Sequence, residues 1–426
     1  MKRTFFLLLT ALVLFASGQP ASAQKYLPRT IQFKGAPEYS DQELLAAAGL
    51  KKGKVLDFAE MSGHTQKLMD TGVFETVSFK FDGVDLIYTL VPHTELYPVR
   101  LENLPLAPGK ELDAALHSRI PLYHGKVPVE GGLTEEVRLA LEEMLAAKGI
   151  KTTVAALPYT DPRLHQVTAM SYNITSPSVQ VGEIHIDGVA APLDSKVAEI
   201  LARLTGSNYD VEGSPAQIET NLGTYYRDMG YLETEVHATA QSTPVIEPET
   251  IHIPFQVSIS QGALYKISGI QLAPGLLVTQ ADFDRQAHIH PGDIADGTRV
   301  RANWQFIEHQ YHNKGYMKAV VHPAANFDRA QGTVSFTVGV EPGPVYRMGR
   351  LIIQNTAEDL RAAMWAAWKL QGGEIFDESS LLTYFTSQNQ KTPLGRTFAS
   401  ANCKYMLTIN DEIHTVDVTL RVEKRQ

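Results

Sequence analysis

Residues 206–231, GSNYDVEGSPAQIETNLGTYYRDMGY, carry the pattern that decides the fold. Gly206 stands four residues before Asp210, and a helix-length segment then leads to Gly230 and Tyr231. Within that segment the apolar residues fall on one face of a helix: Ile218, Leu222, Tyr225 and Met229. The pattern predicts an amphipathic helix that Gly230 ends, because glycine adopts the left-handed conformation of a helix C-terminus without steric cost.

The same pattern of glycine and aspartate residues recurs along the chain. Its first half, Gly-x-x-x-Asp, occurs at Gly53/Asp57, Gly206/Asp210, Gly292/Asp296 and Gly373/Asp377. Its second half, a glycine followed by an apolar residue, occurs at Gly72, Gly149, Gly230 and Gly315. These second glycines recur at nearly equal intervals of about eighty positions. So regular a spacing predicts one structural unit in tandem copies.

The unit around residues 206–231 has the order β-α-α-β-β. Residues 181–187 alternate apolar and polar side chains, which predicts a short strand, and a first helix is expected over about 193–204. Ser214 is the expected N-cap of the second helix, and two strands follow over 232–239 and 251–259. Ser40/Glu43 and Thr279/Asp282 are expected capping boxes of first helices elsewhere. The predicted class is α+β, with a small three-stranded mixed sheet and two helices on one of its faces in each unit.

Five such units are expected after an export signal. Their boundaries fall at residues 24–95, 96–177, 178–260, 261–342 and 343–426. The second unit is a weaker copy, with Val129-Glu130 where aspartate is expected. The fifth is weaker still, because its second glycine lies in Pro393-Leu394-Gly395. Its closing strand is expected over 413–422.

Residues 1–23 have the features of a cleaved signal peptide: Lys2 and Arg3, an apolar run, and Ala21-Ser22-Ala23. Removal of the two basic residues takes the net charge from −9 to −11, which argues against nucleic acid as a partner. Cys403 is the single cysteine of the chain, so an intramolecular disulfide is excluded. The mature chain is therefore expected to be exported and held together by hydrophobic cores.

No catalytic residue, metal site, cofactor or small-molecule substrate is predicted. The chain lacks a Gly-x-Ser-x-Gly elbow, a glycine-rich phosphate loop and a His-Glu-x-x-His motif. His309 and His312, with Glu308 and the upstream pair His288 and His290, are weighed as metal ligands but interpreted as solvated polar positions. The aspartates of Gly-x-x-x-Asp are interpreted as helix caps rather than calcium ligands. The recurring tyrosines are interpreted as core residues: Tyr225, Tyr226, Tyr231, Tyr311 and Tyr316.

The unit resembles the POTRA (polypeptide-transport-associated) domain of outer-membrane barrel assembly and two-partner secretion proteins. In the first unit the match is carried by Ile31-Gln-Phe-Lys-Gly35, Leu44, Gly49, Gly53, Leu68, Gly72-Val-Phe74 and Val77. The resemblance extends over about residues 26–425. It implies capture of unfolded outer-membrane proteins, or docking of envelope assembly factors, by β-strand addition to an exposed sheet edge.

In the resembling family, the second strand of each unit lies at the edge of its sheet. In the first unit this strand is residues 74–81, with Lys80 and Glu75 as guards against aggregation. The expected peptide-binding residues are Phe74, Val77, Phe79 and Phe81.

The resemblance leads to an expectation about location and to an alternative function. Proteins with five such domains usually continue into a membrane barrel, whereas this sequence ends at Gln426. The expectation is therefore a periplasmic arm associated with the outer membrane, with a separate barrel protein as a candidate partner. The alternative is a purely structural envelope scaffold, or a signal-anchored arm, with no unfolded client. An esterase or metal hydrolase is the least favoured function.

Overall fold

The structure, a computed structural model, describes residues 24–187, 194–386 and 393–424. The predicted signal peptide, residues 1–23, lies outside the described residues, as does the predicted start of a helix at residue 193.

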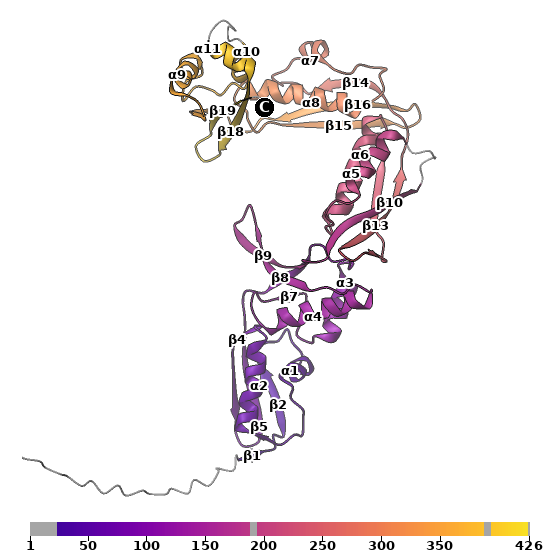
Figure 1. The fold of residues 1–426 in the computed structure, drawn as a ribbon, viewed down its shortest axis with the longest axis vertical. Helices are drawn as coiled ribbons and strands as arrows, with labels where there is room; N and C mark the ends of the chain where they lie inside the picture. The colour runs from indigo at the N-terminus through magenta and orange to yellow at the C-terminus, as the bar shows by residue number, and fades with distance from the viewer. Residues whose placement is uncertain (1–23, 188–193, 387–392, 425–426) are drawn as a thin grey trace, which may run out of the picture. The chain divides into compact units, whose positions relative to one another are not determined.

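The described residues form short helices and strands in alternation (Figure 1). The helices are α1 (Asp41–Ala48), α2 (Phe58–Asp70), α3 (Lys110–Arg119), α4 (Gly132–Ala147), α5 (Ser195–Leu204), α6 (Gly213–Asp228), α7 (Gln280–Gln286), α8 (Gly297–His312), α9 (Glu358–Ala367), α10 (Ser379–Thr386) and α11 (Pro393–Ser400). The strands up to the middle of the chain are β1 (Lys25–Tyr26), β2 (Thr30–Lys34), β3 (Leu56–Asp57), β4 (Phe74–Phe81), β5 (Asp85–Pro92), β6 (Tyr97–Leu101), β7 (Lys126–Val127), β8 (Val154–Asp161), β9 (Gln166–Ile174) and β10 (Ser178–Asp187). The remaining strands are β11 (Glu235–Ala240), β12 (Val245–Ile246), β13 (Thr250–Ser260), β14 (Lys266–Leu272), β15 (Val320–Asp328), β16 (Thr333–Glu341), β17 (Arg347–Gln354), β18 (Ala401–Asn410) and β19 (Thr415–Lys424).

The strands of the described residues form small separate sheets, which confirms the α+β class. Three sheets have the order β2-β5-β4, β14-β16-β15 and β17-β19-β18. Two sheets gain a short fourth strand: β7-β6-β9-β8, and β10-β13-β11 with β12 beside β13. A further two-stranded ribbon pairs β1 with β3. The expectation of three strands in every unit was therefore wrong for two sheets, because short loop segments pair with a neighbouring strand.

Each three-stranded sheet has its last strand in the middle. β5 runs parallel to β2 and antiparallel to β4, and β16 and β19 are paired in the same way. Leu86, Tyr88 and Leu90 alternate along β5 and are fully buried. The central strand therefore supplies the sheet's contribution to the core, while the second strand of the unit lies at an edge.

The contacts of the chain divide it into two compact units. Of the described residues, one unit holds those up to His185 together with Leu201–Ala216 and Thr239–Gln256, and the other holds those in the ranges 186–200, 217–238 and 257–424. In the second unit, Figure 1 shows α8 lying along the sheet of β14, β16 and β15. Ile307 and Tyr311 of α8 are buried there with Val334 and Val338 of β16. The division into five domains stays a prediction.

The predicted helix caps are largely confirmed. Asp57 caps α2 and forms a capping box with Glu60, and the Asp296 carboxylate accepts the N–H groups of residues 298 and 299 at the start of α8. Ser40 and Glu43 form the predicted capping box of α1. Thr279 caps α7 by accepting the N–H of Asp282, but the predicted capping box is incomplete, because the Asp282 carboxylate accepts the Thr279 hydroxyl rather than its backbone N–H. The aspartates of Gly-x-x-x-Asp therefore hold helix N-termini, where a carboxylate is favoured by free N–H groups and the helix dipole.

Three local predictions were wrong. The strand expected from residue 232 begins only at Glu235. Ser214 does not cap α6: the Asp210 carboxylate accepts the N–H of Gly213, and the Ser214 hydroxyl instead accepts the N–H of Asp210. The aspartate prevails because its charged oxygen lies before the first turn, whereas Ser214 is already inside the helix. The last strand begins at Thr415 rather than at Ile413, which lies exposed in the preceding turn.

Candidate functional site

The predicted peptide-binding strand is β4, and it lies at the edge of its sheet. β4 pairs with β5 and with no other strand of the described residues. The register is Phe81 opposite Leu86, Phe79 opposite Tyr88 and Val77 opposite Leu90, with a shift between Phe74 and Thr76. Glu75 is therefore the extra residue of a β-bulge.

The direction of each backbone group along β4 follows from the turn that ends it. The N–H of Asp82 donates to the carbonyl oxygen of Asp85 (3.3 Å), so Asp82 points its backbone groups toward β5. Backbone groups alternate between the two sides of an antiparallel strand. Lys80, Ser78 and Thr76 therefore pair with β5, whereas Phe81, Phe79 and Val77 point their N–H and C=O groups to the open side.

The bulge extends this alternation to Phe74. The N–H of His93 donates to the carbonyl oxygen of Val73 (2.7 Å), so Val73 points toward β5 and the next residue, Phe74, points outward. In the described parts of the chain, no strand or loop hydrogen-bonds to this outer side. The four residues expected at the edge thus share one backbone direction.

The side chains of these four residues are buried or half-buried, and three of them pack against other aromatic rings. Phe74 is buried, with its ring centroid 5.8 Å from that of Tyr39. Phe79 lies 5.3 Å from Phe58, the first residue of α2, and Phe81 lies 4.8 Å from Tyr26 of β1. Phe79, Phe81 and Val77 are half-buried, and Glu75, Ser78 and Lys80 are exposed. An added strand would therefore meet the backbone of β4 rather than its apolar side chains.

An exposed apolar surface adjoins the ribbon of β1 and β3. Phe58 is 69% exposed, and Leu27 and Val55 are also exposed. Phe58 directly follows β3 and contacts Phe79 of the edge strand. A peptide added to β4 would thus have apolar surface within reach at the Phe81 end. Sequence reasoning missed Phe58, because it is a helix-start residue outside the strand pattern.

Two other edge strands carry a proline that faces outward. The Val338 carbonyl accepts the N–H of Ala273 and so points away from β15; its partner Pro323 therefore points to the open side. The Tyr172 carbonyl accepts the N–H of Glu102, so Met170, two residues earlier, also points away from β8, and its partner Pro158 points outward. Proline has no N–H to donate, so these two edges are less suited to accept a strand.

The two histidines weighed as metal ligands do converge on a carboxylate, but on a different one. Nδ1 of His309 and Nδ1 of His312 lie 2.8 and 3.0 Å from the same oxygen of Glu378, at the start of α10. Hydrogen bonds from His312 and His309 outweigh the effect of burial and lower the pKa of Glu378. Among the described residues, His288 and His290 do not belong to this group. Glu378 was missed because it lies far beyond His312 in the sequence.

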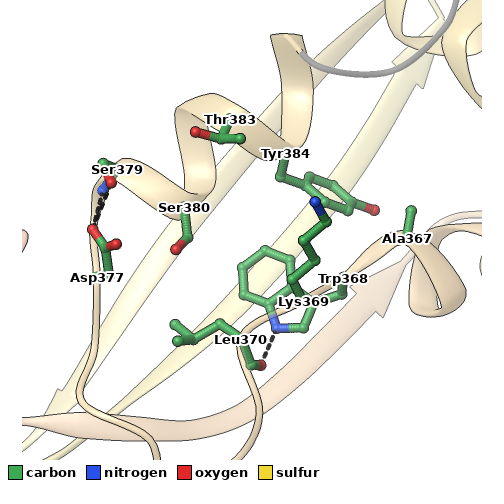
Figure 2. A pocket seen from close by; sticks show the side chains of 9 residues that line it. All are labelled: Ala367, Trp368, Lys369, Leu370, Asp377, Ser379, Ser380, Thr383 and Tyr384. Carbon is green, nitrogen blue, oxygen red and sulfur yellow. Dashed lines mark hydrogen bonds between the residues drawn. The ribbon is translucent and has the colours of Figure 1, made fainter.

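The region around the sheet of β17, β19 and β18 contains a cavity of about 250 Å³, which is lined by residues at the end of α9 and in α10. Figure 2 shows the Trp368 indole N–H donating to the carbonyl of Leu370 (2.6 Å), with Lys369 extending toward Tyr384. On the other side, Asp377 accepts the hydroxyl of Ser379 (2.6 Å) at the start of α10. These polar contacts fasten the helix ends, and we assign no chemistry to the cavity.

The recurring tyrosines are partly core residues. Tyr226 and Tyr311 are buried, whereas Tyr225, Tyr231 and Tyr316 are half-buried. Two further tyrosines are buried directly before a strand: Tyr265 before β14 and Tyr346 before β17. The Tyr265 hydroxyl donates to Glu233, and the Tyr346 hydroxyl donates to Asp411 (2.8 Å).

The comparison with protein families identifies the fold of two segments. A family model named POTRA, described as "Surface antigen variable number repeat", matches residues 29–92 and 265–343. These two segments are POTRA domains. The first contains β2, β5 and β4, so the candidate edge belongs to a POTRA domain, and the second contains the sheet of β14, β16 and β15.

Individual relatives are distant. A protein of Treponema pallidum (strain Nichols) named "Putative outer membrane protein assembly factor" is 19% identical over 221 residues, which make up 49% of this chain and 26% of that protein. The chain thus matches about a quarter of this relative's length.

Solved POTRA structures match as follows. The crystal structure of Haemophilus influenzae BamA POTRA3-5 is 15% identical and matches with a TM-score of 0.43, over 59% of this chain and 98% of that one. POTRA1-3 of the periplasmic domain of Omp85 from Anabaena is 18% identical, with a TM-score of 0.23 and coverage of 59% and 98%. The assignment of POTRA domains rests on the family-model match.

Within the described residues, no helix has both the length and the apolar character required to cross a bilayer.

Proposed function

We propose that this chain is a non-catalytic periplasmic scaffold in outer-membrane protein assembly or protein transport. It captures client or partner polypeptides by adding their strands to the open edge of β4. The observation that carries the proposal is the row of outward backbone N–H and C=O groups at Val77, Phe79 and Phe81, which have no backbone partner among the described residues. An extended peptide would hydrogen-bond to these groups, as β5 does on the other side of β4.

The comparisons support this class of function. Two segments are POTRA domains, and a relative that matches about half of the chain is named as an outer-membrane protein assembly factor. By its composition the chain is acidic, with a net charge of −9, which disfavours nucleic acid as a partner.

β4 is better suited to capture than the edge strands β8 and β15. It offers eight residues without proline, whereas the outward positions of β8 and β15 include Pro158 and Pro323. Lys80 and Glu75 are exposed on β4, and charged side chains at an edge limit uncontrolled pairing between copies. Recognition through the main chain tolerates many sequences, which suits clients that share strand-forming character rather than a motif.

The proposal is tested by peptide binding to Val77 variants. Val77→Pro removes one outward N–H and leaves the ladder to β5 intact, because Val77 does not donate to β5. Val77→Thr is the matched control, since it keeps both backbone groups and a β-branched shape. We expect fluorescence anisotropy with a labelled strand peptide from an unfolded outer-membrane barrel to show at least tenfold weaker binding for Val77→Pro, and nearly unchanged binding for Val77→Thr.

Two results would contradict the proposal. Equal binding by the two variants, with circular dichroism showing that both are folded, would remove β4 from the mechanism. Absence of binding by the parent chain would favour the second candidate function.

The second candidate is a structural arm in the envelope, either free in the periplasm or held by an uncleaved signal segment. It is favoured by the close packing between the end of α8 and the start of β17, where a Cβ at Gly315 would lie 2.8 Å from the carbonyl oxygen of Tyr346. A spacer requires such defined junctions, whereas strand capture requires only an open edge. Membrane fractionation of cells that produce the full-length chain tests the tethered form.

A further inference from the structure

A second group of two histidines and one glutamate lies between the first sheet region and the next. Glu43 belongs to α1, His117 to the last turn of α3, and His124 to the loop before β7. Nε2 of His124 lies 3.0 Å from Oε1 of Glu43, and Nε2 of His117 lies 3.3 Å from the same oxygen. Three atoms that can bind a metal therefore converge from two consecutive parts of the chain.

The hydrogen bond of His117 determines which of its nitrogens carries a proton. Nδ1 of His117 lies 2.8 Å from the carbonyl oxygen of Tyr123. A carbonyl oxygen only accepts, so Nδ1 must donate, and Nε2 of the neutral ring is a bare lone pair. That lone pair faces the carboxylate of Glu43. In the neutral ring two acceptors thus face each other at 3.3 Å, an arrangement that a bound cation would make favourable.

The other carboxylate oxygen is already held in place. Oε2 of Glu43 accepts the N–H of Ser40 (2.6 Å) and its hydroxyl (2.8 Å) in the capping box of α1. Both Glu43 and His117 are thus oriented by a second hydrogen bond on the far side of the group, which is the support that metal ligands commonly have.

The three atoms lie within 4.8 Å of one another, and the two contacts to Glu43 have lengths close to those at a tetrahedral ion. Ligands about 2.0–2.1 Å from Zn²⁺ at tetrahedral angles lie about 3.3–3.4 Å from each other. The contact from His117 to Glu43 has this length, at 3.3 Å, and the contact from His124 is slightly shorter, at 3.0 Å.

The group around Glu378 differs in which histidine nitrogens face the carboxylate. There both histidines direct Nδ1 to one carboxylate oxygen, at 2.8 and 3.0 Å. Two neutral rings that carry their protons on Nδ1 satisfy this carboxylate without a cation. The two groups have the same composition, and they differ in His117, whose Nδ1 faces the carbonyl of Tyr123 rather than the carboxylate.

We propose that His117, His124 and Glu43 bind a divalent transition-metal ion, with Zn²⁺ as the best match to imidazole and carboxylate ligands. Water completes the coordination. The bound ion joins α1 to the segment that contains α3 and the loop before β7, and it stabilises their packing because it binds only the folded arrangement. This site is independent of strand capture by β4.

The test is metal binding by the full mature chain, residues 24–426, after removal of metals with a chelator at pH 7.5. Zn²⁺ is titrated by calorimetry, and Co²⁺ is used as a spectroscopic substitute for tetrahedral coordination. We expect one tight site per chain and a visible Co²⁺ band. Binding should weaken at least tenfold in His117→Gln and in Glu43→Gln. The matched control is His309→Gln, which removes a histidine from the other group and should bind as the parent does.

Folding provides a further check. Zn²⁺ should raise the thermal midpoint of the parent at pH 7.5 but not that of folded His124→Gln. Absence of tight binding at pH 7.5 would overturn the proposal and assign the contact to an imidazolium–carboxylate pair. Equal weakening in His309→Gln and His117→Gln would also overturn it.

Discussion

The backbone N–H of Tyr346 donates a 2.7 Å hydrogen bond to the carbonyl oxygen of Gly315. This bond joins the start of β17 to the glycine that follows α8. An equivalent hydrogen bond, 3.0 Å long, joins the N–H of Tyr265, before β14, to the carbonyl oxygen of Gly230, after α6. The glycines that punctuate the sequence are therefore also contact points with the next sheet, as well as helix ends.

The contact predicts unequal costs for two glycine substitutions in the same backbone region. Gly315 and Gly292 have φ values of 84° and 94°, so alanine at either position is strained by about 1–2 kcal/mol. A Cβ at Gly292 meets nothing within 4 Å, whereas one at Gly315 lies 2.8 Å from the backbone oxygen of Tyr346. We expect Gly315→Ala to lower the free energy of unfolding by roughly 1–3 kcal/mol more than Gly292→Ala. Urea unfolding of the two variants measures the difference, and equal losses would show that the contact is not tight.

The backbone directions along β4 predict an alternating pattern of amide hydrogen exchange. The N–H groups of Thr76, Ser78 and Lys80 pair with β5 and should exchange slowly, whereas those of Val77, Phe79 and Phe81 should exchange fast. Residue-resolved exchange by NMR checks this. Addition of a client peptide should slow the second set and leave the first unchanged. Uniformly slow exchange before any peptide is added would mean that the edge is already covered.

Two ion pairs at equivalent positions have opposite charge order. Three residues after Gly230, Glu233 pairs with Arg329; three residues after Gly315, Lys318 pairs with Asp411 (2.6 Å). In each pair the partner lies in the hairpin turn of the following sheet. We expect Lys318→Glu to lower the thermal midpoint slightly, because it places two negative charges together. Adding Asp411→Lys should restore the midpoint. The pair is exposed, so the coupling should fade in 1 M salt, and a salt-independent coupling would contradict this account.

The lowered pKa of Glu378 predicts an acid-sensitive contribution to stability. Hydrogen bonds from His312 and His309 lower the pKa in the folded state below its ordinary value of 4.5. The contribution is therefore present above about pH 4.5 and is lost as the pH falls through the folded-state pKa. In Glu378→Gln the decline of the thermal midpoint below pH 4.5 should be shallower than in the parent. Parallel curves for the two proteins would exclude this role.

Local features of the fold could be predicted because they depend on neighbours in the sequence. Asp57, Asp296 and Ser40 cap helices as expected, since a cap needs only its own first turn. The residues of the edge strand were also identified, because the apolar alternation of residues 74–81 and the resemblance place them together.

Features that depend on distant segments could not be predicted. The glycine spacing indicates where a helix ends but not that Ile294 and Leu264 would meet a Cβ at Gly230. Glu378 and Glu43 meet histidines from remote parts of the sequence, and no periodic pattern links them. The outward direction of Pro158 and Pro323 likewise depends on hydrogen bonds made by the neighbouring strand.

The bulge at Glu75 has a consequence for how the edge strand tolerates change. Because of that extra residue, the backbone N–H and C=O groups of Phe74 point to the open side, as those of Val77, Phe79 and Phe81 do. The side chains of all four residues lie on the buried face of the sheet. Substitutions that repack these side chains leave the surface offered to a visiting strand chemically the same. Sequence changes in the core therefore need not weaken peptide recognition. Proline is the substitution at these four positions that removes the backbone N–H donor.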